Sequence, residues 1–268
     1  ARIGRDERVY DEAHELAWRA KGLQREALRL SDPNLLDNAI AISINALNIN
    51  VKCGVAYQTI CISLFLKGLL RWGNDPSASS EQVEDWAVKF RAQLPKSPMA
   101  YCFLGLARSR KSQFQAADRE FQYAHELNPN DSLVLRMWAF NQACAGEFES
   151  AKKHAHMAIR LSPKDSYIHP AHLALAMAAF IEKDSAAFEE WAGKAIQLAP
   201  HAPIRRAMMI AYAAEIGDQA LLETHRTELM RFAPDFIDSV FSGENQLFQK
   251  PEHTAMLLDG LRKAGFSG

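Results

Sequence analysis

The clearest pattern along the chain lies between Pro98 and Pro163, where two successive segments repeat the same order of small, large apolar and polar positions. The first copy comprises Tyr101-x2-Leu104-Gly105, Ala117-x3-Phe121-x2-Ala124 and Leu127-Asn128-Pro129. The second, 34 residues later, comprises Leu135-x2-Trp138-Ala139, Ala151-x3-Ala155-x2-Ala158 and Leu161-Ser162-Pro163. Apolar residues three and four apart predict amphipathic helices, and each X-Pro step predicts a turn. The pattern therefore predicts two consecutive helix pairs.

Small residues recur where two helices of a pair must approach closely. Gly105, Ala117, Ala139 and Ala151 occupy these positions, and larger apolar side chains such as Phe121 fill the remaining space. One pair cannot bury its apolar face alone, so the pattern requires further stacked pairs on either side.

Prolines extend this punctuation along most of the chain. Helices are expected to break at Pro95, Pro129, Pro163, Pro200 and Pro234. The spacing is 34 residues except between Pro163 and Pro200, where it is 37, and the three extra residues fall near Tyr167-Ile168-His169-Pro170. Gly217 takes the turn position that Gly146 holds earlier. Six helix pairs result.

The ends of the chain keep the pattern less strictly. Near the N-terminus helices are predicted at 9–30, 35–49 and 55–72, followed by a loop over 73–80 in which Ser80 is the expected N-cap of the next helix. After Pro234 the period fails, and an irregular or short helical link leads to an amphipathic helix at 252–265. We expect a repeat array over residues 1–234, and a linker with a C-terminal capping helix over 235–268.

The spacing and residue types of the two clear copies resemble the tetratricopeptide repeat (TPR). This resemblance implies an all-α fold, a right-handed α-α superhelix of about six TPR-like helix pairs with a C-terminal capping helix. The last third is also similar to the helical-repeat C-terminus of bacterial class III adenylate or guanylate cyclase-like proteins and of some winged-helix regulators. That similarity rests on Trp191-Ala192-x2-Ala195, Pro200, Phe232-Ala233-Pro234-Asp235-Phe236 and the segment 258–266. Nothing in residues 1–30 resembles a cyclase core or a winged helix, so the regulatory half alone is implied.

In TPR proteins the first helix of each pair lines the concave face. Matching positions predict a mainly apolar partner-binding groove formed by Met99, Cys102, Leu106, Arg110, Leu133, Arg136, Phe140, Cys144, Leu173, Met177 and Phe180. The chaperone-binding repeats hold a peptide carboxylate with Lys and Asn, and those places here carry Cys102 and Leu106, which argues against that clamp. Arg136 either meets an acidic residue of a partner or pairs with an acidic side chain of a neighbouring repeat. The alternative to an open groove is that adjacent helices cover these apolar residues.

The charge balance and the cysteines limit the classes of partner and the cellular location that we expect. The 31 Lys and Arg nearly balance the 32 Asp and Glu, so we expect no nucleic acid to bind through this chain. Cys53, Cys61, Cys102 and Cys144 lie in apolar stretches without metal-ligand spacing, which favours buried thiols and a cytoplasmic location. The longest apolar run, 54–70, contains polar residues and predicts a buried helix and no membrane span. The chain starts without Met, which suggests a piece of a longer or processed polypeptide.

The familiar local signatures of catalysis are absent from the sequence, which has no glycine-rich phosphate loop, no G-x-S-x-G and no H-E-x-x-H. We expect no enzyme, no catalytic residues and no cofactor. His154 and His156 stand two apart and would point to different sides of a helix, and Pro170 is expected to break the backbone between His169 and His172. No metal site is therefore predicted.

Two functions remain open. One is a scaffold that binds a protein or peptide in its groove, or forms a homodimer through it. The other is a domain that senses a small apolar ligand and regulates an attached cyclase-like or transcriptional module. A groove exposed along several units favours the peptide, and a closed pocket favours the ligand.

Overall fold

The computed structural model describes residues 3–30, 32–70, 72, 76–165 and 167–267, and the chain divides into two compact units, 1–129 and 130–268. Helices are the only regular elements within these described ranges.

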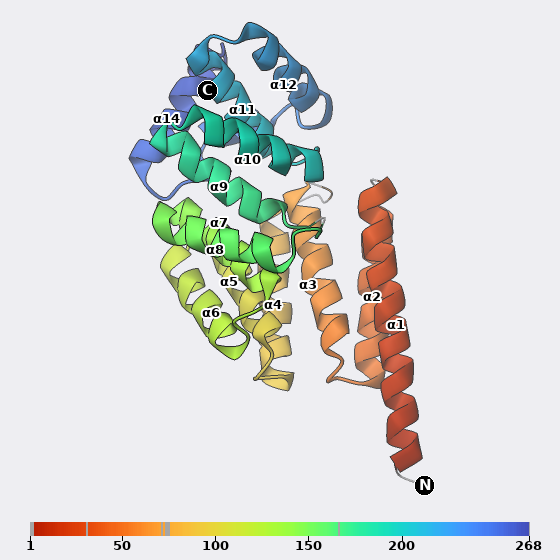
Figure 1. Ribbon diagram of the computed structural model, residues 1–268. Helices are drawn as coiled ribbons and strands as arrows, with labels where there is room; N and C mark the ends of the chain where they lie inside the picture. Colours follow the sequence, from red (N-terminus) through yellow and green to blue (C-terminus); the bar gives the residue numbers. More distant parts are fainter. Residues whose placement is uncertain (1–2, 31, 71, 73–75, 166, 268) are drawn as a thin grey trace. The chain divides into compact units, whose positions relative to one another are not determined.

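The N-terminal unit contains three helix pairs (Figure 1). They are α1 (Ile3–Leu30), α2 (Pro33–Ile49), α3 (Gly54–Leu69), α4 (Pro76–Gln93), α5 (Pro98–Arg110) and α6 (Phe114–Leu127). Each helix packs against the next, and α3 also contacts α1 and α5, so that successive pairs stack. Every described pair therefore buries its apolar face against a neighbour.

Close approach of α5 and α6 explains the small residues of the repeat. A Cβ atom on Gly105 would lie 3.0 Å from the ring of Phe121, and Phe121 and Ala117 have no exposed surface. Where the first two pairs meet, the buried Gln24 amide donates to the Thr59 carbonyl at 3.1 Å and to the Ser63 hydroxyl at 2.9 Å. The motif residues are therefore packing positions, as their spacing predicts.

The C-terminal unit contains three further pairs and two additional helices. They are α7 (Ser132–Ala145), α8 (Phe148–Leu161), α9 (His169–Glu182), α10 (Ser185–Leu198), α11 (Pro203–Ile216), α12 (Gln219–Phe232), α13 (Phe236–Phe241) and α14 (Pro251–Lys263). The pairs follow one another along the chain, with α7 and α8 packed on α9, and α14 returns to pack along α11 (Figure 1). The capping helix is thus present, and α13 is the short link predicted before it.

The proline punctuation is confirmed, because all five predicted breaks fall in turns outside the helices. Three boundaries differ by more than two residues, the first being that of the helix predicted at 9–30, which begins at Ile3. The helix predicted at 55–72 ends at Leu69, and α4 begins at Pro76, so Ser80 lies inside it and is not its N-cap. Proline suits the first turn of a helix because its missing N–H has no acceptor there. Residues 73–75 of the predicted loop, and residues 1 and 2, lie outside the described residues.

The cysteines and the apolar character of the helices are both singled out in the sequence. The four cysteines are buried and form no disulfide. Among the described helices, none combines the length and apolar character that a membrane span requires.

Candidate functional site

Three equivalent turns of the C-terminal unit join the first and second helix of each pair. Each places its central residue in the left-handed backbone region: Gly146 with φ 81°, Lys183 with φ 60° and Gly217 with φ 76°. Glycine adopts this conformation freely, whereas a residue with a Cβ pays roughly 1–2 kcal/mol. Lys183 is therefore held in a strained position, and it stands at the rim of a pocket.

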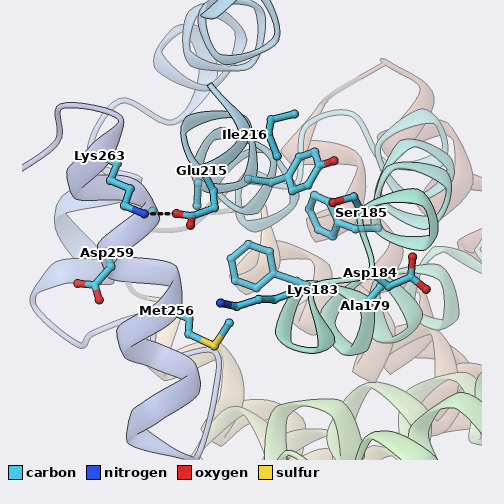
Figure 2. Close-up of a pocket in the computed structure, with 14 residues that line it drawn as sticks. Ala179, Lys183, Asp184, Ser185, Glu215, Ile216, Met256, Asp259 and Lys263 are labelled. Carbon is cyan, nitrogen blue, oxygen red and sulfur yellow. Dashed lines mark hydrogen bonds and ion pairs between the residues drawn. The ribbon is translucent and has the colours of Figure 1, made fainter. Parts of the chain in front are cut away.

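The pocket lies where the ends of α9, α10 and α11 face α14, and its volume is about 260 Å³ (Figure 2). Its interior is apolar and aromatic. Phe188 packs between Phe180 and Tyr212, with ring centroids 5.5 and 4.7 Å away. Met256 of α14 closes one side, and Ile216, 48% exposed, stands at the edge. The pocket suits an apolar group that enters from solvent.

Charged side chains of both signs form the rim of this pocket. Lys263 is paired with Glu215, and Lys183 extends toward the side of Met256 (Figure 2). The Asp184 carboxylate accepts from the Ala187 N–H at 3.1 Å and so caps α10. Lys183 makes no ion pair within the described part of the chain. It is therefore the rim charge that remains available for a ligand.

Just behind the rim, the hydroxyl of Tyr212 donates to Glu189 at 2.6 Å. Burial, and then this hydrogen bond, raise the pKa of Tyr212. The phenol therefore stays neutral and its ring stays fixed in the pocket wall.

The segment from Gln249 to Ala264, called the strap below, forms the wall opposite the repeats. Its Gln249 N–H donates to the Cys144 carbonyl at 2.8 Å. Further along, a Cβ on Gly260 would lie 2.7 Å from the Cβ of Ala211 and 2.9 Å from its carbonyl oxygen. The strap therefore reaches from the fourth pair to the sixth, and its close approach to α11 depends on glycine.

At the opposite ends of α7, α9 and α11 lies a buried cluster of cationic and polar groups. Arg136, 7% exposed, donates from Nη1 to Asp165 Oδ2 at 2.5 Å. Oδ1 of the same carboxylate accepts from the Tyr167 N–H at 2.9 Å. Of the two roles considered for Arg136, the structure shows pairing with an acidic residue of the chain itself.

Arg205 occupies the same cluster and is 3% exposed. Its Nη2 donates to His169 Nδ1 at 2.7 Å, so the imidazole must be neutral to accept. Burial, followed by the charges of Arg205 and Arg136, lowers the pKa of His169 to about 2. Burial lowers the pKa of Arg205 to about 10, which leaves it charged at neutral pH. In the sequence, His169 is considered only as a metal ligand and Arg205 is not singled out, although the three extra residues lie near His169.

The predicted groove residues divide between the two units. In the N-terminal unit Met99, Cys102 and Leu106 are buried and Arg110 is exposed. In the C-terminal unit Arg136, Cys144, Leu173 and Met177 are buried, whereas Leu133, Phe140 and Phe180 keep part of their surface. Phe180 lines the pocket, and Leu133 and Phe140 lie seven residues apart along α7. The assignment of these eleven residues to a partner-binding groove stays a prediction.

The histidines serve packing and hydrogen bonding in this unit. His154 stacks on Trp138 with centroids 4.0 Å apart, and both His156 and His172 contact the ring of Trp191. The break expected at Pro170 is wrong, because this proline lies in the first turn of α9, where it continues the helix. Within the described ranges no three His, Cys, Asp or Glu side chains gather as metal ligands would.

No family model matches the chain, and no curated protein matches it in sequence. Solved structures do match. A chain of the APC/C hetero-tetramer Cut9–Hcn1 is 15% identical over 97% of this chain and 47% of its own length, with a TM-score of 0.64. Human IFIT1, solved as a dimer with m7Gppp-AAAA, is 14% identical over 91% of this chain and 63% of its own, with a TM-score of 0.57.

TTC0263, a thermophilic TPR protein of Thermus thermophilus, is 18% identical over 79% of this chain and 99% of its own, with a TM-score of 0.50. The present chain spans about half the length of the Cut9–Hcn1 chain that it matches. Identities this low carry the fold alone. Together with the helix pairs described in each unit, they show that this chain has the all-α helical-repeat fold of the tetratricopeptide-repeat proteins.

Proposed function

We propose that this chain is a non-catalytic interaction scaffold or regulatory TPR domain, which binds a peptide or partner protein on the groove side of its repeats. The observation that carries the proposal is Lys183 at the rim of the apolar pocket. Two equivalent turns of this unit use glycine, whereas this one keeps a lysine in the same left-handed conformation, as the α5–α6 turn of the N-terminal unit keeps Ser112. Strain retained beside a pocket is a feature of binding sites, because the side chain supplies something that glycine cannot.

The occupant we propose is an apolar side chain of a peptide, with an acidic residue beside it. A volume of about 260 Å³ lies just below the roughly 300–1,000 Å³ of small-molecule sites and suits one large side chain. Ile216 and Lys183 are both exposed at the mouth, so a peptide backbone has room to continue past it. Lys183, without an ion-pair partner among the described residues, favours a carboxylate on the peptide.

Leu133, Phe140 and Phe180, the predicted groove residues of the C-terminal unit that keep part of their surface, extend the contact that such a partner would make. A homodimer through this surface is a second form of the same interaction. Nucleic acid is a weaker choice, because the net charge of −1 supplies no basic surplus for a phosphate backbone. Human IFIT1 was solved with m7Gppp-AAAA, so the fold itself does not exclude such a ligand. We place the chain in the cytoplasm on the strength of its four buried thiols.

The alternative function is a sensor of small apolar ligands that regulates an attached cyclase-like or winged-helix module. The aromatic wall formed by Phe180, Phe188 and Tyr212 supports it, as does the resemblance of the C-terminal third. Native mass spectrometry of the purified chain distinguishes the two. A small molecule retained with the folded protein, and lost on introducing Ile216→Glu, would favour the sensor.

A peptide-display selection on the folded chain tests the scaffold. The selected peptides are expected to share an apolar residue next to an acidic one, and calorimetry then measures their affinity for variants. Ile216→Glu places a charge at the pocket edge and should weaken binding roughly tenfold or more. Met230→Glu is the matched control, because Met230 is 43% exposed and lies outside the pocket lining. Equal affinity of both variants, or no selected peptide, would remove the pocket as the binding site.

A further inference from the structure

We propose that Arg205, together with Arg136 and His169, forms a carboxylate-binding site that receives an acidic group of the peptide. The site is separate from the apolar pocket, and the peptide as source of the carboxylate rests on the function proposed above.

Arg205 is a buried cation without a counter-ion among the described residues. Its Nη2 has only the neutral His169 as partner, and its Nε and Nη1 are buried and have no partner within the described part of the chain. The Nε atom of Arg136 is in the same state. Leaving a buried charge uncompensated is costly, and an anionic group would remove that cost.

The neighbouring Arg206 shows that the missing acidic partner is a feature of Arg205 and not of every buried arginine in α11. Arg206 is 8% exposed, on the same turn of α11. Its Nε donates to the Pro200 carbonyl at 3.2 Å, its Nη1 to His225 at 3.2 Å, and its Nη2 lies 3.7 Å from Glu228. Both arginines have little exposed surface, and among the described residues only Arg206 has a carboxylate close to its guanidinium.

The charge of the cluster indicates which anion fits. Arg136 and Arg205 contribute two positive charges, Asp165 contributes one negative charge, and His169 is neutral as an acceptor. One positive charge remains, which a carboxylate neutralises and a phosphate dianion would overcompensate. The N-terminus of α9 at His169 adds a further partial positive charge. Asp165 keeps 29% of its side chain exposed, so the cluster is not fully closed to solvent.

The position of the cluster also matches the pocket. His169 and Phe180 lie at opposite ends of α9, about 16 Å apart at the rise of an α-helix. An extended peptide covers this distance in about five residues. A ligand with a carboxylate about five residues from an apolar residue would therefore reach both sites.

The test follows the Arg Nε–H signals by NMR while acetate is added, with sodium chloride at equal ionic strength as reference. We expect a saturable shift of the Arg205 signal and, for the parent, a higher melting temperature in acetate than in chloride. Arg205→Met should abolish the melting-temperature gain without unfolding the chain, because an apolar side chain replaces an unpaired buried charge. Arg206→Met is the matched control and should keep the acetate response.

Additional ligands separate the sources of the anion. N-acetylglycine represents a peptide C-terminus, N-acetylaspartate amide represents an acidic side chain, and inorganic phosphate represents the competing chemistry. Tighter binding of phosphate, or no saturable response to acetate, would overturn the proposal. Should Arg205→Met fail to fold, Arg205→Lys keeps the charge without the guanidinium fork and should bind acetate several-fold more weakly; an unchanged affinity would count against the site.

The outcome is distinguishable from that of the proposed function. Suppose that the selected peptides bind Arg205→Met as tightly as the parent and that acetate gives no response. The carboxylate site is then contradicted, and the proposed scaffold function still stands. If acetate binds but the display selection yields no peptide, the carboxylate site is supported and the proposed scaffold function is contradicted.

Discussion

The two units follow the same repeat rule, and they differ in how often they break it. In the N-terminal unit Gly105 meets Phe121, and the buried Gln24 finds its acceptors within the neighbouring pair. In the C-terminal unit three extra residues precede α9, Lys183 takes a left-handed turn position as Ser112 does in the N-terminal unit, and a buried arginine has no acidic partner among the described residues. Regular spacing therefore describes how the helices pack, and the departures mark where binding chemistry is to be sought.

Each departure has a free-energy cost that the repeat does not require. The left-handed Lys183 and the unpaired Arg205 both make the free protein less stable than a consensus repeat would be. The comparison therefore predicts two kinds of mutational effect. Enlarging the regular positions should destabilise the chain, and regularising the irregular ones should stabilise it while weakening binding.

We expect the largest loss of folding stability for Gly105→Leu in the N-terminal unit. The new side chain would overlap the Phe121 ring, and overpacking of this kind costs roughly 1–3 kcal/mol. Ala117→Leu should behave similarly, because Ala117 has no exposed surface. Urea unfolding measures both effects. Unchanged stability of both variants would mean that the repeat register is wrong.

Gly260→Ala should release the strap from α11, at a cost of roughly 1–2 kcal/mol, because its Cβ would meet the backbone of Ala211. Hydrogen exchange of residues 257–264 should become faster while the helices of the N-terminal unit stay protected. Gly193→Ala is the control, because nothing lies within 4 Å of a Cβ there and the residue is inside α10. That variant should gain about 0.5–1 kcal/mol. Equal exchange in both would contradict the close contact.

His169 should make the C-terminal unit lose stability as the pH falls. Its pKa is about 2 in the folded chain and 6.5 ordinarily, so below pH 6.5 the unfolded chain takes up a proton that the folded chain does not. The stabilisation is complete above pH 6.5 and decreases toward lower pH, by at most about 1.4 kcal/mol per pH unit and by less here, because the ring is partly exposed.

Denaturant unfolding at pH 7.5 and pH 5 measures this, with His169→Gln as comparison. The parent should lose about 1 kcal/mol more than the variant over this interval. His172, His225 and His253 also have lowered pKa values, and they cancel because both proteins contain them. Identical losses would show that the His169–Arg205 hydrogen bond is absent in solution.

The smallest effect concerns Lys183. Replacing it with glycine removes the left-handed strain but adds backbone entropy to the unfolded chain, for a net gain of roughly 0.5–1 kcal/mol. The same variant should bind selected peptides several-fold more weakly. Gly217→Lys in the equivalent turn should lower stability and leave peptide binding unchanged. If the Lys183→Gly variant is more stable than the parent and binds the selected peptides equally well, Lys183 has no role in peptide binding.

The helix pairs and their breaks could be predicted because they depend on local rules. Pro129 and Pro163 stop helices through steric effects on the preceding residue, and Gly217 could be matched to Gly146 by counting. Pro76 and Pro170 are the exceptions, since the sequence suggests a loop or a break where proline in fact lies in the first turn of α4 or of α9. Local composition does not separate these two uses of proline.

The candidate site could not be predicted in the same way. The residues predicted for the groove include Phe180 and Arg136, but not Lys183, Arg205 or His169. Lys183 resembles any charged surface residue until its backbone angle is known. Arg205 and Arg206 are identical in type and adjacent, and only the acceptors that the fold places around them distinguish the two. No spacing rule encodes the presence or absence of such partners.

The strap changes how the C-terminal unit must fold. In a repeat array most contacts join neighbours in sequence, so each pair can form as soon as the preceding one is in place. The strap adds contacts across 104 residues, such as that between Lys250 and the Gly146 carbonyl. Closing so long a loop is slow, and during synthesis it must wait until the last helix has been made. We expect the helix pairs to assemble quickly and the strap to dock in a distinct final phase, and a force applied to the C-terminus would detach it before any pair opens.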